Sequence, residues 1–100
     1  MQLKDIARVI RSKNAGPRTT TLDIMFATAV DYERVRASGV LNADTISGLY
    51  HVDPRDVGVI EYPLGLAIKI VLPRRVTAGD PGDRDVYGAQ QHQRLMGIEL

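Results

Sequence analysis

The stretch VGVIEYPLGLAIKIVL (residues 57–72) decides the fold that this sequence predicts. Two apolar, β-branched runs, residues 57–62 and 66–72, stand on either side of Pro63-Leu64-Gly65. This order predicts two antiparallel strands joined by a tight connection. One long strand with a kink at the proline is the alternative. Lys69 is expected to be the outward residue of a second strand that is otherwise mostly covered.

A third strand is predicted for TTTLDIMFA (residues 19–27), which is rich in β-branched and apolar residues. Its apolar side chains alternate, so one face of the strand is expected to be buried. Asp23 and Met25 are expected on the opposite face. We expect this strand and residues 66–72 in one antiparallel sheet. The expected core residues of the two strands are Leu22, Ile24, Phe26, Ile68 and Ile70.

The two ends of the chain predict short helices. Apolar residues at positions 3, 6, 7 and 10 form one stripe at helical spacing, so residues 3–10 predict a helix. The turn RSKNAGP (residues 11–17) is expected to end it, because Gly16 accepts a positive φ. At the other end, residues 87–96 predict a short helix, and residues 98–100 either add an edge strand or dock on the core.

The middle of the chain predicts two further helices and one helical turn. Residues 31–38 form the first helix, which ends at Gly39, and Asn42 caps a second helix that runs to about Tyr50. Residues 53–56 predict one helical turn with proline at its first position. The inward residues of the two helices are Tyr32, Val35, Ile46 and Leu49.

Length and composition place these elements in one domain, residues 1–100. A chain of 100 residues has room for one modest core. Strands and helices alternate without a βαβ pattern long enough for a parallel sheet. The sequence therefore predicts an α+β fold with an antiparallel sheet and helices packed on one face, ferredoxin-like or related.

The charge balance excludes some classes of protein. With 13 basic and 12 acidic side chains the net charge is +1, which argues against nucleic acid as a partner. The most apolar run, residues 57–73, is interrupted by charges and too short to span a bilayer, so no membrane association is expected. The absence of cysteine and of a signal peptide favours a cytoplasmic location.

The stretch GDPGDRDVYGAQQH (residues 79–92) concentrates polar chemistry in a loop and the helix after it. Its candidate catalytic residues are Asp85, Tyr87 and His92, and its candidate partner contacts are Asp80, Asp83, Arg84, Gln90 and Gln91. The spacing of the aspartates and the histidine matches neither a calcium loop nor a zinc motif, so neither metal nor cofactor is expected. Residues 77–84 are expected to become ordered only with a partner or ligand, and a plain surface loop is the alternative.

A set of hydrogen-bond donors surrounds the turn after the first predicted helix. Its members, the candidate ligand-binding residues, are Arg11, Ser12, Lys13, Asn14 and Arg18. Together they predict a site for a small anion. The alternative is a solvated turn at a helix end, where cations interact favourably with the helix dipole.

Several motifs along the chain resemble those of one family. These are LKDIARVIRSKNAGP, LDIMF, YERVRASGVL, GLAIKIVLPR, GDPGDRDVYGAQQH and RLMGIEL. The chain resembles a family of small bacterial proteins of unknown function, over almost its whole length. Members of that family are encoded beside, and sometimes fused to, proteins that resemble AtuA of acyclic-terpene utilisation. The resemblance therefore implies an AtuA-like protein, encoded nearby, as the partner.

A weaker resemblance is to the ferredoxin-like C-terminal domain of the AtuA-type proteins. Their arginine-serine-glycine-aspartate-lysine-glycine turn is similar to residues 11–16, and their aspartate-x-histidine-glycine-lysine motif is similar to residues 85–89. Four functional-looking side chains of that family are replaced, by Asn14, Ala15, Tyr87 and Ala89. The resemblance therefore implies a small subunit that supports a site on a partner.

Three functions follow as hypotheses. The first is an accessory subunit of an AtuA-like two-component enzyme that acts on a carboxylate or acyl-thioester compound. The second is a non-catalytic, homo-oligomeric module that binds a small anion or a protein, and the third is an independent lyase or hydratase. The first hypothesis also predicts that Arg11 is held by a carboxylate of the C-terminal segment, Asp85, because the two positions match the two motifs of the resembled domain.

Overall fold

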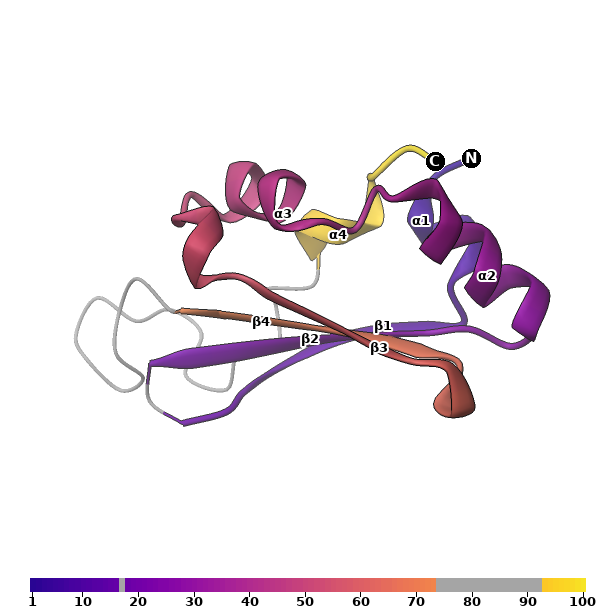
Figure 1. The fold of residues 1–100 in the computed structure, drawn as a ribbon, viewed down its shortest axis with the longest axis horizontal. Coiled ribbons are helices and arrows are strands. Elements are labelled where there is room, and N and C mark those ends of the chain that lie inside the picture. Colours follow the sequence, from indigo (N-terminus) through magenta and orange to yellow (C-terminus); the bar gives the residue numbers. More distant parts are fainter. Residues whose placement is uncertain (17, 74–92) are drawn as a thin grey trace.

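One layer of the domain is a four-stranded antiparallel sheet in the order β1-β2-β4-β3, and the other is made of helices on one side of it (Figure 1). The structure is a computed structural model that describes residues 1–16, 18–73 and 93–100. The strands are β1 (Val9–Asn14), β2 (Thr19–Met25), β3 (Gly58–Tyr62) and β4 (Ala67–Pro73). The helices are α1 (Leu3–Ile6), α2 (Ala29–Ser38), α3 (Ala43–Tyr50) and α4 (Gln93–Met96), with single 3₁₀ turns η1 (Pro54–Asp56) and η2 (Pro63–Gly65). The predicted α+β architecture is confirmed at this level.

The hairpin predicted for residues 57–72 is present. Strand β3 pairs antiparallel with β4 from Gly58 opposite Val71 to Tyr62 opposite Ala67, so the alternative of one kinked strand is wrong. The connection is the 3₁₀ turn η2, after which Leu66 adopts a left-handed conformation with φ 49°. Strand β4 then crosses the middle of the sheet and pairs with β2 on its other side.

The core lies between the sheet and the helices. Strands β2 and β4 contribute alternate residues, and Leu22 faces Ile70 while Ile24 faces Ile68 across the strand pair. The described buried apolar residues are Leu3, Leu22, Ile24, Phe26, Tyr32, Val35, Leu41, Ile46, Tyr50, Ile68, Ile70, Leu72 and Leu95. All five predicted core residues of the two strands are among them, which confirms the predicted buried face.

The helix boundaries in the middle of the chain follow local signals. Helix α2 ends at Gly39, which has φ 70° as a left-handed C-cap requires. The side chain of Asn42 accepts a hydrogen bond of 2.8 Å from the backbone N–H of Thr45, and this caps α3. Asp53 accepts from the backbone N–H of Arg55 at 2.9 Å and begins the turn η1. These three predictions are confirmed.

The prediction for the start of the chain is wrong. The expected helix over residues 3–10 ends at Ile6, and residues 9–14 form the strand β1 instead of a helix end and a turn. Strand β1 pairs with β2 from Val9 opposite Met25 to Asn14 opposite Thr20. A helix of eight residues is marginal by itself, whereas pairing with β2 supplies a ladder of backbone hydrogen bonds.

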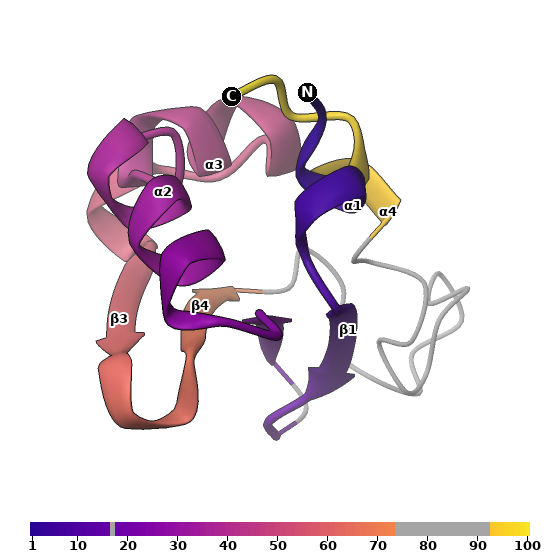
Figure 2. The ribbon, with the colours of Figure 1, turned by 90° about the vertical axis from the view of Figure 1, so that its right-hand side faces the viewer.

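The two ends of the chain lie side by side above the sheet (Figures 1 and 2). The N–H of Leu3 donates to the carbonyl oxygen of Ile98 at 2.8 Å, and the N–H of Leu100 donates to that of Met1 at 3.0 Å. Gln2 and Glu99 form an isolated β-bridge. The last residues therefore dock on α1 instead of extending the sheet. Leu95 of α4 is buried, as expected for the described part of the predicted last helix.

The connectivity differs from that of a ferredoxin-like domain. There the elements follow in the order βαββαβ, whereas here two hairpins, β1–β2 and β3–β4, stand before and after the pair α2–α3. The likeness is therefore limited to an antiparallel sheet with helices on one face. Among the described residues, no helix combines the length and the apolar character needed to cross a membrane.

Replacement of Ile70 by alanine tests the assignment of the core. Ile70 is 0% exposed at the centre of β4, so we expect the variant to lose about 2–5 kcal/mol of the free energy of unfolding. The control is Ile60→Ala on the neighbouring strand β3, where the side chain is 42% exposed and the expected loss is about 1 kcal/mol or less. Urea denaturation measures both losses, and equal losses would contradict the assignment.

Candidate functional site

The face of the sheet turned away from the helices is the candidate site, and we call it the outer face. Its side chains alternate along each strand with those of the core. The described residues on it are Val9, Arg11, Lys13, Thr19, Thr21, Asp23, Met25, Gly58, Ile60, Tyr62, Ala67, Lys69, Val71 and Pro73. No described helix covers this face (Figure 1). Its side chains differ in exposure, from Thr21, which is buried, to Arg11, Lys13, Ile60 and Tyr62, which are exposed.

A row of charged side chains crosses the outer face. The register places Arg11 of β1 opposite Asp23 of β2, and Asp23 opposite Lys69 of β4. Arg11 Nε lies 3.4 Å from Asp23 Oδ2, with side chains that are 57% and 13% exposed. The Nζ atom of Lys69 lies 5.9 Å from the ring centroid of Tyr62 on β3, which is a cation–π distance. One carboxylate thus lies between two cations.

A second, apolar row runs beside the charged one. Val9 pairs with Met25, Met25 with Ala67, and Ala67 with Tyr62, so the row crosses all four strands. Exposure is greatest at its ends, where Val9 is 38% and Tyr62 is 47% exposed. Ile60, the residue opposite Lys69, adds a further exposed apolar side chain on β3. The outer face therefore combines adjoining apolar area with charge.

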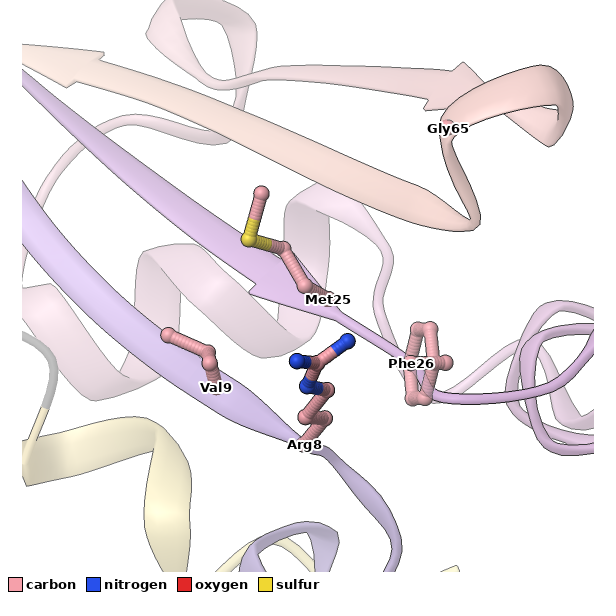
Figure 3. A pocket seen from close by; sticks show the side chains of 5 residues that line it. All are labelled: Arg8, Val9, Met25, Phe26 and Gly65. Atoms are coloured by element: carbon pink, nitrogen blue, oxygen red, sulfur yellow. The ribbon is translucent and has the colours of Figure 1, made fainter.

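A small hollow lies at the end of the apolar row (Figure 3). Its volume is about 310 Å³, and Arg8, Val9, Met25, Phe26 and Gly65 line it. The hollow lies where β1 begins, β2 ends and the turn η2 connects β3 to β4. The guanidinium group of Arg8 lies between the side chains of Val9 and Phe26 (Figure 3). This position offers one cation among apolar walls.

The predicted anion-binding residues do not gather at one point. Because residues 11–14 belong to a strand, Arg11 and Lys13 are exposed on the outer face. Ser12 is buried opposite Leu22 on the core side, and Asn14 faces the same way. Arg18 is exposed near the turn between β1 and β2. The binding of an anion by these five residues stays a prediction.

Arg11 has a partner that differs from the predicted one. Its guanidinium pairs with Asp23 on the neighbouring strand, at the middle of a strand pair and not at a helix end. The interpretation of Arg11 as a charge at a helix end is therefore wrong. Asp85 lies outside the described residues, so the predicted pair of Arg11 with Asp85 stays a prediction. The sequence predicts Asp23 and Lys69 only as outward residues, and the signal for their place in the site is a charge within each of two apolar strands.

The remaining predicted site residues also lie outside the described residues. They are the candidate catalytic residues Asp85, Tyr87 and His92 and the candidate partner contacts Asp80, Asp83, Arg84, Gln90 and Gln91. Their roles stay predictions. Within the parts of the chain that the structure describes, no three histidine, aspartate or glutamate side chains are close enough to hold a metal ion together.

Two phenols with altered acidity belong to the core and not to the outer face. Burial raises the pKa of Tyr32, whose ring packs edge-on against Phe26 at 6.1 Å between centroids. Burial likewise raises the pKa of Tyr50, and the guanidinium of Arg94 lies 5.7 Å from its ring. Both phenols therefore take part in the packing of α2, α3 and α4 through burial, and neither belongs to the outer face.

The ion pair of Arg11 and Asp23 is expected to be weak. Because Arg11 is more than half exposed, a double-mutant cycle with Arg11→Gln and Asp23→Asn should give a coupling free energy of about 0.2–1 kcal/mol. The coupling should fall as salt is raised, since exposed charges are screened. Denaturation of the four proteins measures it. A cycle of Asp23→Asn with Arg34→Gln, on helix α2, is the control with no expected coupling.

Comparison with known proteins gives one match. No curated protein and no solved structure matches the chain. A family model described as Domain of unknown function (DUF4387) matches residues 3–99, which takes in all four strands and the described helices. The expected membership of a family of unknown function is confirmed, and the link to AtuA-like proteins stays a prediction. The chain belongs to the family of the domain of unknown function DUF4387.

Proposed function

We propose that this domain is the accessory subunit of a cytoplasmic two-component enzyme and binds a larger, AtuA-like protein through its outer face. The enzyme acts on a carboxylate or acyl-thioester compound. The nature of the partner and of the substrate is implied by the sequence resemblance. The outer face supports the docking itself, and the apolar row of Val9, Met25, Ala67 and Tyr62 is the observation that carries it.

The apolar row is unusual for a sheet face that no described helix covers. An antiparallel sheet with one solvated face has polar residues on that face. Single exposed apolar residues are common and need no explanation, but these four adjoin one another through the strand register. A few residues near the centre of a contact provide most of the binding free energy between proteins, and tyrosine and arginine are enriched among them. The row therefore supports a protein contact.

The charges around the row favour a partner of opposite sign. Arg8, Arg11, Lys13 and Lys69 lie on or beside the outer face, where Asp23 provides the one carboxylate among the strand residues that the structure describes. In a twofold contact of two identical chains, the same surface meets itself, so these cations would approach one another. An acidic surface of a different protein satisfies them. The charge pattern therefore supports a hetero-complex over the alternative of a homo-oligomer.

The described chemistry of the outer face suits a supporting role. Three of its charged groups, Arg11, Asp23 and Lys69, already lie in register with one another. Asp23 is paired with Arg11, so its carboxylate is occupied by a cation. Such a row positions and neutralises a partner's charges. A site completed by the larger protein is thus better supported than an independent lyase or hydratase.

The proposal predicts that Ile60→Ser weakens a complex with the AtuA-like protein encoded nearby. Ile60 is an exposed apolar residue of the outer face on the edge strand β3, so its loss should lower the affinity about tenfold or more. Val30→Ser is the matched control, because Val30 is an exposed aliphatic residue on α2, in the helical layer. Isothermal titration calorimetry of the unaltered chain, Ile60→Ser and Val30→Ser, each with the purified AtuA-like protein, measures the affinities.

Other outcomes separate the alternatives. Absence of a complex between the unaltered proteins would contradict the proposal. A stable dimer of this chain that Ile60→Ser dissociates would instead support the homo-oligomeric interaction module. Equal weakening by Ile60→Ser and Val30→Ser would mean that the outer face is not the docking surface.

A further inference from the structure

We infer that the hollow beside Arg8 binds a small aliphatic carboxylate, with the carboxylate on the guanidinium group and the chain against the apolar walls. This inference deepens the proposed function and rests on it for the view that the ligand is the substrate or product of the two-component enzyme. The binding of the carboxylate depends only on the geometry of the hollow.

The hollow is held in place by the backbone. The N–H of Arg8 donates to the carbonyl oxygen of Met25 at 2.8 Å, which joins the start of β1 to the end of β2. The N–H of Phe26 donates to the carbonyl oxygen of Leu66 at 2.8 Å, which joins the end of β2 to the hairpin turn. The walls thus come from three segments that are hydrogen-bonded to one another, so the hollow exists before a ligand arrives.

The guanidinium group of Arg8 is available to an anion. Arg11, Arg36 and Arg55 each pair with a carboxylate. Within residues 1–16, 18–73 and 93–100, the side chain of Arg8 has neither an ion pair nor a hydrogen bond. A guanidinium group presents two parallel N–H donors to a carboxylate, and this geometry recognises the planar anion.

The walls select the other end of the ligand. Val9 and Met25 present aliphatic and thioether surface to the hollow (Figure 3), and Gly65 presents backbone without a side chain. Phe26, which is only 4% exposed, adds little area to this lining. The volume of the hollow, about 310 Å³, has room for roughly ten water molecules. A carboxylate with a chain of about six to eight carbons has that size. A phosphate or sulfate ion would leave the apolar walls without contact.

Titration of the isotopically labelled full chain with octanoate tests the inference. We expect changes in the amide NMR signals of Val9, Met25, Phe26 and Gly65 that saturate at about millimolar concentration, as befits a ligand of this size. Acetate has the carboxylate without the chain, and octanol has the chain without the carboxylate. Both should bind at least about tenfold more weakly. Equal binding of octanoate and octanol, or no change with octanoate, would overturn the inference.

Two variants locate the contact. Arg8→Gln should weaken octanoate binding about tenfold, since a hydrogen-bonded charge pair is lost. Arg34→Gln removes the same charge from an exposed position on α2 and should leave the affinity unchanged. Equal effects of both variants would mean attraction by net charge and would contradict a site at Arg8.

The two proposals fail separately. The octanoate titration uses the chain without its partner, so its failure leaves the formation of the complex unaffected. Conversely, octanoate binding without any complex would support the ligand site and contradict the proposed role as an accessory subunit. Octanoate binding that Arg8→Gln weakens about tenfold, together with a complex that Ile60→Ser weakens, is the outcome expected from both proposals.

Discussion

The antiparallel pairing of β2 with β4 is the constraint on which the rest of the structure depends. It joins the hairpin β1–β2 to the hairpin β3–β4 and so makes one sheet of four strands. The register that places Leu22 against Ile70 in the core also places Asp23 against Lys69 on the outer face. A slip of one residue would move the whole apolar set of one strand to the other face. Core and candidate site are therefore consequences of one alignment.

Local signals were sufficient for the parts of the fold that depend on neighbours in sequence. The proline and glycine between β3 and β4, the side chain of Asn42 and the positive φ of Gly39 each act within a few residues. The start of the chain is different, because residues 9–14 become a strand through hydrogen bonds to β2. Apolar positions at helical spacing could not reveal that pairing, which has no signal inside the segment itself.

The candidate site was harder to predict than the core for a related reason. Arg11, Asp23 and Lys69 were visible in the sequence as outward or polar residues, but their contact depends on the registers of two strand pairs. The same holds for the row from Val9 to Tyr62. Alternation within one strand identifies a face, whereas only the pairing of strands shows which residues on that face are neighbours.

The edges of the sheet bear on how the outer face can be used. A free edge strand is a template for pairing with another chain, and charged side chains on it oppose such pairing. Strand β1 carries Arg11 and Lys13, and β3 carries Glu61 and is followed by Pro63. These residues disfavour extension of the sheet by a further strand. The adjoining apolar side chains lie instead on the outer face of the sheet, next to the hollow beside Arg8. A partner that covers the apolar row therefore has to lie across the strands, where it can also close the hollow over a bound carboxylate.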